Sequence, residues 1–564
     1  MAEGKRRGRG GGARGGLRPT PGGRQPQQAA LEDVRRVLGD APRRRDLLIE
    51  HLHRIQDAFG HLSAPHLAAL AEEMRLTTAE VREVATFYHH FDVIEEGETP
   101  PPPLTVRVCG SLSCELLGGQ ELLAELAARA GPGVRVVSTP CVGRCAEAPV
   151  AVVGRNPVGR ATPAAVQDAI RAGRTEPELP PYTDYRTYRR TGGYQTLVAC
   201  VRGLRPLSDI IRSIEAAGLR GLGGGGFPAA HKWRLVRAEP KPRLAVLNAD
   251  EGEPGTFKDR FFLETDPHRV IEGLLIAAWA VEAEEVYIYL RDEYAACREI
   301  LTRELAALQA VPPCELPRLH LRRGAGAYIC GEETALIESI EGKRGQPRPR
   351  PPFPAQVGLF GRPTLVHNVE TVYWIREIIE KGAERFAGLG RRGRKGIRAF
   401  SVSGRVKKPG VYLAPAGVTA RELVFDYAGG MPDGHEFYAY LPGGASGGIL
   451  PASMADLPLD FGALEPHGCS VGSAALVALS DKDRASRAAL NLMRFFAHES
   501  CGKCPPCRSG TAKAAALLEA DRWDLEQLDG LARSMADASI CGLGQAAPNV
   551  IRCVTRYFEE QTVA

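Results

Sequence analysis

Long apolar runs are missing from this chain of 564 residues, and so is an apolar stretch near its N-terminus. No segment approaches the roughly 20 consecutive apolar residues that a membrane-spanning helix needs. Export by the usual route is not expected either, because a secretory signal requires an apolar core. The sequence therefore predicts a cytoplasmic protein without a membrane span.

A strong excess of charge of one sign is also missing, since the formal net charge is only +5. Much of that charge falls within residues 1–28, where arginine and lysine stand in a background of glycine, proline and glutamine with the single acid Glu3. Such a segment cannot bury enough apolar surface to fold alone, so we expect a disordered basic tail. Contact with RNA or with an acidic partner subunit is the alternative for this tail. The nearly neutral remainder argues against a nucleic-acid-binding function.

Cysteine, by contrast, occurs 14 times. Without a sign of export, clustered cysteines indicate metal centres rather than disulfides. Three of them follow the spacing C-x2-C-x2-C, and a single partner lies in a later glycine-containing loop. This pattern is typical of a [4Fe–4S] cluster, whereas zinc sites more often combine two C-x2-C pairs or add histidines. The expected ligands are Cys501, Cys504, Cys507 and Cys541.

A second group of cysteines has the spacings C-x4-C and C-x3-C. Each pair follows a short alternating strand, at residues 104–108 and 134–138, and a helix is expected between them. Loops at the ends of neighbouring strands can present four thiolates to a [2Fe–2S] cluster, and a zinc site is the alternative. The expected ligands are Cys109, Cys114, Cys141 and Cys145. We expect the other six to be solitary buried side chains: Cys200, Cys297, Cys314, Cys330, Cys469 and Cys553.

Proline-rich and turn-rich stretches divide the chain. Prolines at 100–103 end a helical N-terminal region, and residues 176–188 form a polar linker. Strands then alternate with helices, which suggests a parallel sheet. The expected segments are a tail at 1–28, helices at 29–98, the [2Fe–2S] domain at 99–175, an α/β domain at 190–395, a small α+β module at 396–480 and a helical [4Fe–4S] domain at 481–564.

Four short polar loops in the α/β region suggest one cofactor cradle. The glycine run GLRGLGGGGFP (218–228) lets the backbone approach a phosphate or a ring, although it follows a helix and not the strand of a Rossmann fingerprint. A flexible hinge is the alternative for it. NADEGEPGT (248–256) ends a strand, where ligands bind in open α/β sheets; a helix-capping cluster or a metal site is the alternative. The other two loops are YICGEET (328–334) and HNVET (367–371).

Together with KRGQPRPRPPFPA and ESCGKCPPCR, these motifs resemble the FMN- and NADH-binding subunit of respiratory complex I over residues 190–564. Residues 29–175, with CGSLSC and CVGRCAEAP, resemble the thioredoxin-like [2Fe–2S] subunit of the same complex. The resemblance implies a fusion of two subunits with a multidomain α/β and α+β fold. Its parts would be a thioredoxin-like domain, a Rossmann-like FMN/NADH domain, a ubiquitin-like (SLBB) module and a helical cluster domain.

The resemblance also implies residue roles, with hydride transfer carried out by FMN and no catalytic acid or base. Phe227 and Phe353 match positions that stack on the NADH adenine, and Glu253 and Glu333 match positions near the nicotinamide. Leu222 replaces an arginine that is usual in the family, so the phosphate contact of that arginine is not expected here. The implied FMN-binding residues are Gly221, Gly223, Gly224, Lys232, Asn248, Asp250, Glu251, Tyr328, Gly331, Glu332, Asn368 and Thr371.

Residues 44–53, 85–92 and 539–548 are most similar to β subunits of NAD-dependent formate dehydrogenases. The expected function is that of a diaphorase subunit moving electrons between NAD/NADH, FMN and the two clusters. Its partner would be a catalytic α subunit with a molybdenum or tungsten pterin, because no such ligand set is visible in this chain. The alternatives are the diaphorase of an NAD-reducing hydrogenase, a complex I subunit, and a non-catalytic iron–sulfur scaffold without flavin.

Overall fold

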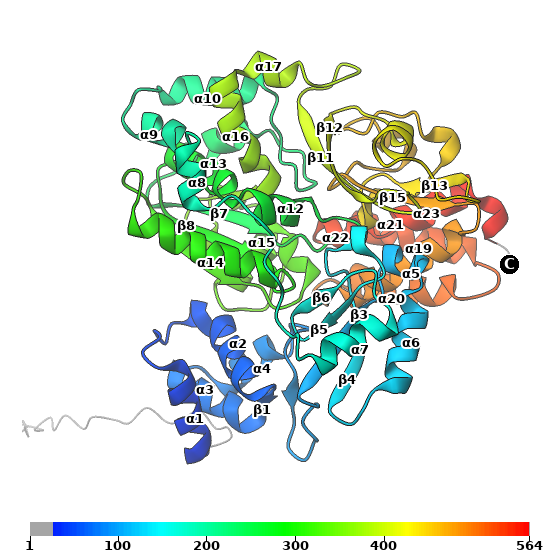
Figure 1. Ribbon diagram of the computed structural model, residues 1–564, viewed down its shortest axis with the longest axis horizontal. Helices are drawn as coiled ribbons and strands as arrows, with labels where there is room; N and C mark the ends of the chain where they lie inside the picture. Colours follow the sequence, from blue (N-terminus) through cyan, green and yellow to red (C-terminus); the bar gives the residue numbers. More distant parts are fainter. Residues whose placement is uncertain (1–25, 563–564) are drawn as a thin grey trace, which may run out of the picture.

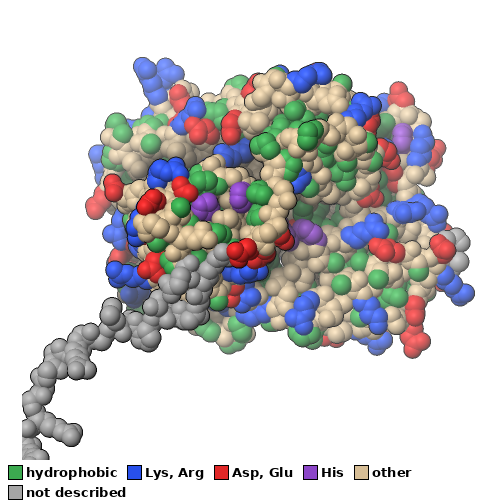
Figure 2. Space-filling view, turned by 90° about the horizontal axis from the view of Figure 1, so that it is seen from below, with side chains coloured by type: hydrophobic (Ala, Val, Ile, Leu, Met, Phe, Trp, Pro, Cys, Tyr) green, Lys and Arg blue, Asp and Glu red, His purple; other side chains and the backbone are tan. Residues whose placement is uncertain are grey.

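The computed structural model describes residues 26–562, so the basic tail expected at 1–28 lies almost entirely outside the described residues. In Figure 1 the N-terminal helices (blue) and a first sheet (cyan) lie below a larger α/β layer (green) and a second mixed sheet. Across residues 26–562 no helix has the length and apolar character needed to cross a membrane. Side chains of both charge signs are interspersed over the face seen in Figure 2.

The N-terminal region consists of helices, two of which begin at side-chain caps. The Ser63 side chain accepts the His66 backbone N–H at the start of one helix, with proline in its first turn. Thr77 and Glu80 form a capping box at the start of the next. A two-residue parallel pair, β1 (Leu62–Ser63) with β2 (Val93–Ile94), closes the region. The helices are α1 (Gln28–Leu38), α2 (Leu48–Phe59), α3 (Ala64–Met74) and α4 (Thr78–Ala85).

The first cysteine group lies in a four-stranded sheet of order β4-β3-β5-β6. Its two leading strands pair in parallel, and Cys109 at the end of one stands opposite Thr139 at the end of the other. The two cysteine loops therefore leave the same edge of the sheet. The strands are β3 (Leu104–Cys109), β4 (Val134–Thr139), β5 (Ala151–Val153) and β6 (Asn156–Val158), and the helices are α5 (Leu112–Leu116), α6 (Gly119–Arg129) and α7 (Pro163–Arg171).

The α/β layer contains a four-stranded sheet of order β10-β7-β8-β9 in which all pairs are parallel, as the sequence predicts. The chain forms three strands toward one side and then returns to place β10 on the other side of β7. The topological switch point therefore lies between β7 and β10, where open α/β sheets bind ligands. The strands are β7 (Arg243–Ala249), β8 (Ala283–Leu290), β9 (Arg318–Arg323) and β10 (Thr364–Asn368).

Helices surround this sheet, and α13 is buried on nearly all sides. It contacts α16 so closely that a Cβ on Gly273 would lie 1.9 Å from the Val372 carbonyl oxygen. The sequence interpretation placed His367 and Asn368, the last two residues of β10, in a polar loop, and it extended the linker to residue 188, although a helix begins at Tyr185. The helices are α8 (Tyr185–Arg190), α9 (Gln195–Val201), α10 (Leu207–Ala216), α11 (Ala229–Ala238), α12 (Lys258–Thr265), α13 (Pro267–Ala280), α14 (Ala295–Ala310), α15 (Glu333–Ile340), α16 (Val369–Lys381) and α17 (Ala383–Ala387).

A five-stranded mixed sheet of order β12-β11-β15-β13-β14 follows, with β15 parallel to β11. One apolar core continues from the N-terminal helices through α15 and this sheet into the C-terminal helices. The strands are β11 (Ile397–Gly404), β12 (Gly410–Pro415), β13 (Phe437–Leu441), β14 (Leu450–Pro451) and β15 (Ala475–Ser480). The helices are α18 (Ala420–Glu422), α19 (Ala485–His498), α20 (Pro505–Leu518), α21 (Leu525–Ala538), α22 (Gly542–Ala546) and α23 (Asn549–Tyr557). The multidomain α/β and α+β class is thus confirmed.

Candidate functional site

Two asparagines mark the switch point of the parallel sheet. Asn248 of β7 and Asn368 of β10 are register partners at the carboxyl ends of adjacent strands. The Asn248 amide donates to the Gly331 carbonyl oxygen over 2.8 Å, which ties the YICGEET loop to this edge. Asn368 caps α16 by accepting the Glu370 backbone N–H at 3.0 Å. Three of the four predicted cradle segments, at 248–256, 328–334 and 367–371, therefore meet at the carboxyl ends of β7 and β10.

The glycine run reaches the same edge. The Leu222 backbone N–H donates to the Thr371 hydroxyl at 2.9 Å, so the run is anchored on the first turn of α16. A Cβ on Gly223 would lie 3.0 Å from the Asn368 Cβ, and Gly224 has a φ of +116°, which favours glycine. The run thus packs against the switch point because Gly223 has no side chain, and Gly224 supplies the backbone conformation that this turn requires.

The two glutamates at the start of α15 have different surroundings. Glu332 caps the helix, since one of its oxygens accepts the backbone N–H groups of Thr334 and Ala335 at 3.0 and 2.9 Å. Glu333 forms an ion pair with Lys232, 2.8 Å away. Lys232 also donates to the Val366 carbonyl oxygen of β10 at 3.0 Å. The predicted phosphate-binding lysine and the predicted nicotinamide-side glutamate are therefore paired with each other.

Two of the three carboxylates after β7, Glu251 and Glu253, are bound by different partners, whereas Asp250 Oδ2 has no hydrogen-bond partner. Glu251 accepts the backbone N–H groups of Asp259 and Arg260 at the start of α12, at 2.8 and 3.1 Å. Glu253 accepts from the Tyr328 hydroxyl and from a backbone N–H of the mixed-sheet region. Asp250 is only partly buried as a residue, but its Oδ2 is buried, and desolvation raises the pKa of its carboxyl well above the usual range. The Glu251 side chain is thus engaged by the first turn of α12, and its backbone carbonyl oxygen accepts from Arg291.

Two buried carboxylate oxygens among the predicted FMN-binding residues lack a hydrogen-bond partner, Asp250 Oδ2 and Glu332 Oε1, although Glu332 Oε1 lies 3.5 Å from the Arg350 guanidinium. Buried polar atoms are nearly always satisfied, so Asp250 Oδ2 calls for a partner that belongs to the site. The hydroxyls and ring nitrogens of a flavin mononucleotide are suitable partners. The residues present therefore fit this group, and the assignment of each as an FMN contact stays a prediction.

A buried charged trio that sequence reasoning missed lies beneath Asn368. Lys258 forms ion pairs with Asp259 at 2.7 Å and with Glu370 at 3.1 Å, and all three are almost fully buried. Although burial opposes it, these carboxylates raise the pKa of Lys258. Asp259 also accepts the Asn368 amide at 2.5 Å. The trio fixes the orientation of this asparagine, and its only sequence signal was the KDR that follows the acidic loop.

The first cysteine group forms a compact quartet. All four thiols are buried, and the sulfurs of Cys141 and Cys145 lie 3.4 Å apart. Cys109 lies close enough to Cys114 and Cys141 for both sulfurs to perturb its pKa, which is raised. The Gly143 backbone N–H points at the Cys141 sulfur over 3.4 Å. Four buried thiols with a backbone donor suit an iron–sulfur cluster.

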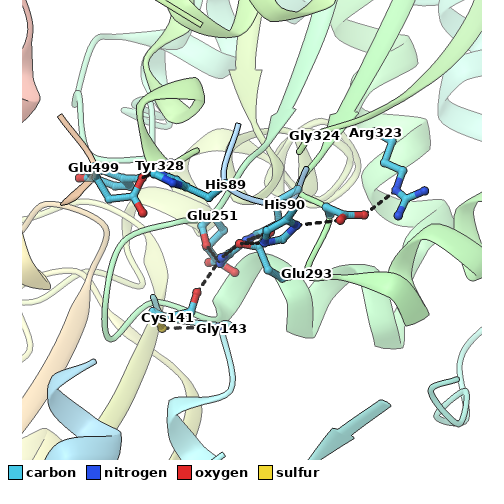
Figure 3. Close-up of polar contacts among 12 residues, drawn as sticks. His89, His90, Cys141, Gly143, Glu251, Glu293, Arg323, Gly324, Tyr328 and Glu499 are labelled. Carbon is cyan, nitrogen blue, oxygen red and sulfur yellow. Dashed lines mark hydrogen bonds and ion pairs between the residues drawn. The ribbon is translucent and has the colours of Figure 1, made fainter. Parts of the chain in front are cut away.

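The Cys141–Cys145 loop is docked on the α/β layer by two buried arginines. Arg291 donates to the Cys141 carbonyl oxygen at 2.7 Å and also to the Glu251 carbonyl oxygen. Arg260 donates to the Gly143 carbonyl oxygen at 2.9 Å. Figure 3 shows Cys141 and Gly143 beneath Glu251 and Glu293. One arginine thus touches both a predicted cluster-ligand residue and a predicted FMN-binding residue.

The second quartet combines the loop after α19 with the start of α22. Cys507 packs against this helix so closely that a Cβ added to Gly544 would lie 2.8 Å from the Cβ of Cys507. Burial raises the pKa of Cys507 to about 11 and that of Cys541 to about 12. Such thiols ionise near neutral pH only where a metal compensates the charge. Cys501 and Cys504 complete the quartet, and both lie close enough to Cys507 to contribute to its raised pKa.

The two aromatic residues predicted to stack on the nucleotide are unusually exposed for their type. Phe227 is 44% exposed and Phe353 is 52% exposed. Arg350, in the same proline-rich segment as Phe353, lies within 3.5 Å of the Glu332 carboxylate. This segment therefore borders the cradle, and an adenine-stacking role for the two rings stays a prediction.

The interpretation of the remaining cysteines as solitary is wrong for two of them. The sulfurs of Cys469 and Cys553 lie 3.4 Å apart between the mixed sheet and α23, and both are buried. Cys314 is only partly buried. A pair that is separated by so many residues leaves no local pattern, because the contact depends on how two segments pack.

Three family descriptions match successive parts of the chain. "Thioredoxin-like [2Fe-2S] ferredoxin" covers residues 34–174, "Nuo51 FMN-binding domain" covers 214–377, and "NADH-ubiquinone oxidoreductase-F iron-sulfur binding region" covers 487–564. The chain thus contains an FMN-binding domain between a [2Fe–2S] domain and a second iron–sulfur region.

Relatives and solved structures agree with this division. The F 2 subunit of the NADH-quinone oxidoreductase of Rhizobium meliloti (strain 1021) is 41% identical over 393 residues, which cover 67% of this chain and 93% of that protein. The corresponding F subunit of Aquifex aeolicus (strain VF5) is 42% identical over 66% of this chain and 89% of its own. A crystal structure of a NAD+-reducing [NiFe]-hydrogenase in the H2-reduced state shares 33% identity and a TM-score of 0.81, over 92% of this chain and 93% of the other. The chain therefore belongs to the family of NADH-quinone oxidoreductase F subunits, with a thioredoxin-like [2Fe–2S] domain fused in the same polypeptide.

Proposed function

We propose that this chain transfers electrons between NAD(H) and two iron–sulfur clusters, as the NAD-reducing β subunit of a formate dehydrogenase. One observation supports the electron-transfer part: Arg291 donates both to the Cys141 carbonyl oxygen and to the Glu251 carbonyl oxygen after β7, and Asn248 of β7 donates to the YICGEET loop. A cluster quartet and a flavin cradle are therefore neighbours within one chain. FMN, when bound, exchanges two electrons with NAD(H) and single electrons with clusters.

The residues of this chain bind and orient the reactants rather than transfer protons. Asn248 and Asn368 face the switch point, and Asp250, whose Oδ2 has no hydrogen-bond partner, supplies a polar contact to the flavin beside Glu332. Lys232 lies one turn into α11 and provides a positive charge for the FMN phosphate once the ion pair between Lys232 and Glu333 is broken. Phe227 and Phe353 offer exposed rings to the adenine, and Glu253 and Glu333 lie on the nicotinamide side.

Formate as the electron source rests on the similarity of the N-terminal and C-terminal segments to formate dehydrogenase β subunits and on the complete [2Fe–2S] quartet. The partner would then be a catalytic α subunit that holds a molybdenum or tungsten pterin. Hydrogen is the second candidate, because the hydrogenase structure matches over 92% of this chain. A complex I context is the third candidate, and the NADH-quinone oxidoreductase relatives support it.

The native complex distinguishes these candidates. It should be purified through this chain, and NAD+ reduction should be measured with formate and with hydrogen. Formate-dependent reduction with no hydrogen-dependent reduction is the expected result, and the opposite result would assign the chain to a hydrogenase. The isolated chain should hold a yellow chromophore that NADH bleaches, whereas a non-catalytic scaffold would hold none.

A further inference from the structure

Two histidines and a glutamate from opposite ends of the chain meet at one point. His89 follows α4, His498 is the last residue of α19, and Glu499 comes directly after it. One donor atom of each lies within 4.8 Å of the other two. The two imidazole rings stack with centroids 4.2 Å apart, and the carboxylate is 3.9 Å from His89 and 3.3 Å from His498.

These donors are held by contacts to the α/β layer. The buried Glu499 accepts the Tyr328 backbone N–H at 2.9 Å, which fixes its carboxylate beside the predicted flavin cradle. The backbone N–H of His89 donates to the Gly326 carbonyl oxygen at 3.1 Å. Figure 3 shows His89, Tyr328 and Glu499 side by side. The three donors are therefore brought together by the fold before any ligand arrives.

A cavity of about 230 Å³ opens beside the cluster and is lined by all three residues. It leaves room for water next to the imidazoles, which are 40% and 48% exposed. Three arginines line the cavity: Arg135 is paired with Asp92 and Arg291 with Glu293, whereas Arg107 forms no ion pair among the described residues. A cation at the cluster would thus face a wall in which two of the three arginine charges are balanced.

We propose that His89, His498 and Glu499 bind one Zn²⁺ ion, with water from the cavity as the fourth ligand. Two histidines, one glutamate and a water form an open zinc site, in which the ligand–metal distances are about 2.0–2.2 Å. Imidazole nitrogens favour zinc over magnesium or calcium, which prefer oxygen ligands only. The donors need to close by roughly one ångström from their present separations. The two rings would have to turn out of their stacked arrangement to do so, and their partial exposure leaves room for this movement.

The ion would fasten the N-terminal helical region to the cluster domain. Glu499 lies two positions before Cys501, the first thiol of the second quartet. Zinc at this point would therefore restrain the loop that carries Cys501. None of the three donors is a cysteine of either quartet, although Cys141 lines the same cavity.

The test uses the full chain loaded with FMN and both clusters, so that the cluster thiols are not free to take zinc. The protein is treated with a chelator, dialysed against Zn²⁺, and analysed for zinc and iron in the same sample. Wild type and the control His467→Gln should each bind one zinc per chain. His89→Gln and His498→Gln should bind it at least about tenfold more weakly, with unchanged iron. Equal zinc affinity in all four proteins, or no zinc in wild type, would overturn the proposal.

A second measurement does not depend on the variants folding. Wild-type crystals soaked in Zn²⁺ should give an anomalous peak at the zinc edge between the three side chains. A peak at the cysteines only, or no peak, would also overturn the assignment.

Discussion

At the scale of single residues, the role of the Glu333 carboxylate depends on the two cations that it pairs with. Its carboxylate is 2.8 Å from Lys232 and 3.7 Å from Arg350, so it acts as the negative member of a small network. Helix capping, the alternative role for this position, belongs to Glu332 instead. Glu333 is therefore available to influence a bound nucleotide.

We predict that Glu333→Gln weakens the binding of NAD+ relative to NADH by roughly fivefold, equivalent to about 1 kcal/mol. Removing this carboxylate leaves Lys232 without its ion-pair partner and Arg350 with Glu332 alone, near a nicotinamide ring that is positive only in its oxidised form. Both dissociation constants and the melting temperature should be measured, with Glu338→Gln on the same helix as the control. An unchanged affinity ratio with a lowered melting temperature would mean that Glu333 only stabilises its helix.

The burial of His53 makes the stability of the folded chain depend on pH. It is buried, its Nε2 contacts the Gly324 carbonyl oxygen at 2.8 Å, and burial lowers its pKa to about 3. The unfolded chain binds a proton at this position below about pH 6.5, whereas the folded chain does not. Stability contributed by the neutral ring is therefore complete above pH 6.5 and is lost as the pH falls toward 3.

We predict that His53→Gln, which retains an N–H donor, loses less stability than wild type between pH 7.5 and 5.5. The difference should be about 1.4 kcal/mol for a single histidine. Chemical denaturation at the two pH values measures it. Parallel losses in both proteins would show that His53 does not bind the extra proton on unfolding.

At the scale of elements, the sequence predicts the cradle loops but not their arrangement. NADEGEPGT and HNVET are both visible as polar loops, and a parallel sheet follows from the alternation of strands and helices. The placement of β10 beside β7 is a long-range pairing, so no local pattern reveals that Asn248 and Asn368 are neighbours. The Lys258 trio is invisible for the same reason, since its members come from two helices.

Gly448 tests the contact between the mixed sheet and α23. A Cβ at this position would lie 2.7 Å from the Cys469 sulfur and 2.9 Å from the Cys553 sulfur, at a φ of +81°. We predict that Gly448→Ala destabilises the protein by about 2–4 kcal/mol, from overpacking and backbone strain together. The melting temperature reports this loss.

Gly462→Ala is the matched control for that substitution, because Gly462 has a φ of +77° and open space around it. It should show the backbone cost alone. Adding Cys469→Ala to Gly448→Ala should recover part of the stability. Equal effects of the two glycine substitutions would show that the sulfur pair does not resist the added methyl group.

At the scale of the whole molecule, Arg291 joins the [2Fe–2S] domain to the α/β layer. It is buried, donates to the Cys141 and Glu251 carbonyl oxygens, and is paired with Glu293. We predict that Arg291→Met alters or removes the electron paramagnetic resonance signal of the [2Fe–2S] cluster, while NADH-to-dye activity continues from the flavin. Arg322→Met removes another buried arginine, paired with Asp46, and should leave that signal unchanged. Identical spectra of the Arg291 variant and wild type would show that this arginine does not influence the [2Fe–2S] cluster.

The central claim is that one chain connects NADH, flavin and the [4Fe–4S] cluster. Anaerobic titration of the isolated, FMN-loaded chain with NADH, followed by absorption and electron paramagnetic resonance, tests it most directly. Bleaching of the flavin together with a reduced [4Fe–4S] signal is predicted, and Cys504→Ala should lose the cluster signal but keep the bleaching. A wild-type chain that dithionite reduces but NADH leaves fully oxidised would contradict the account.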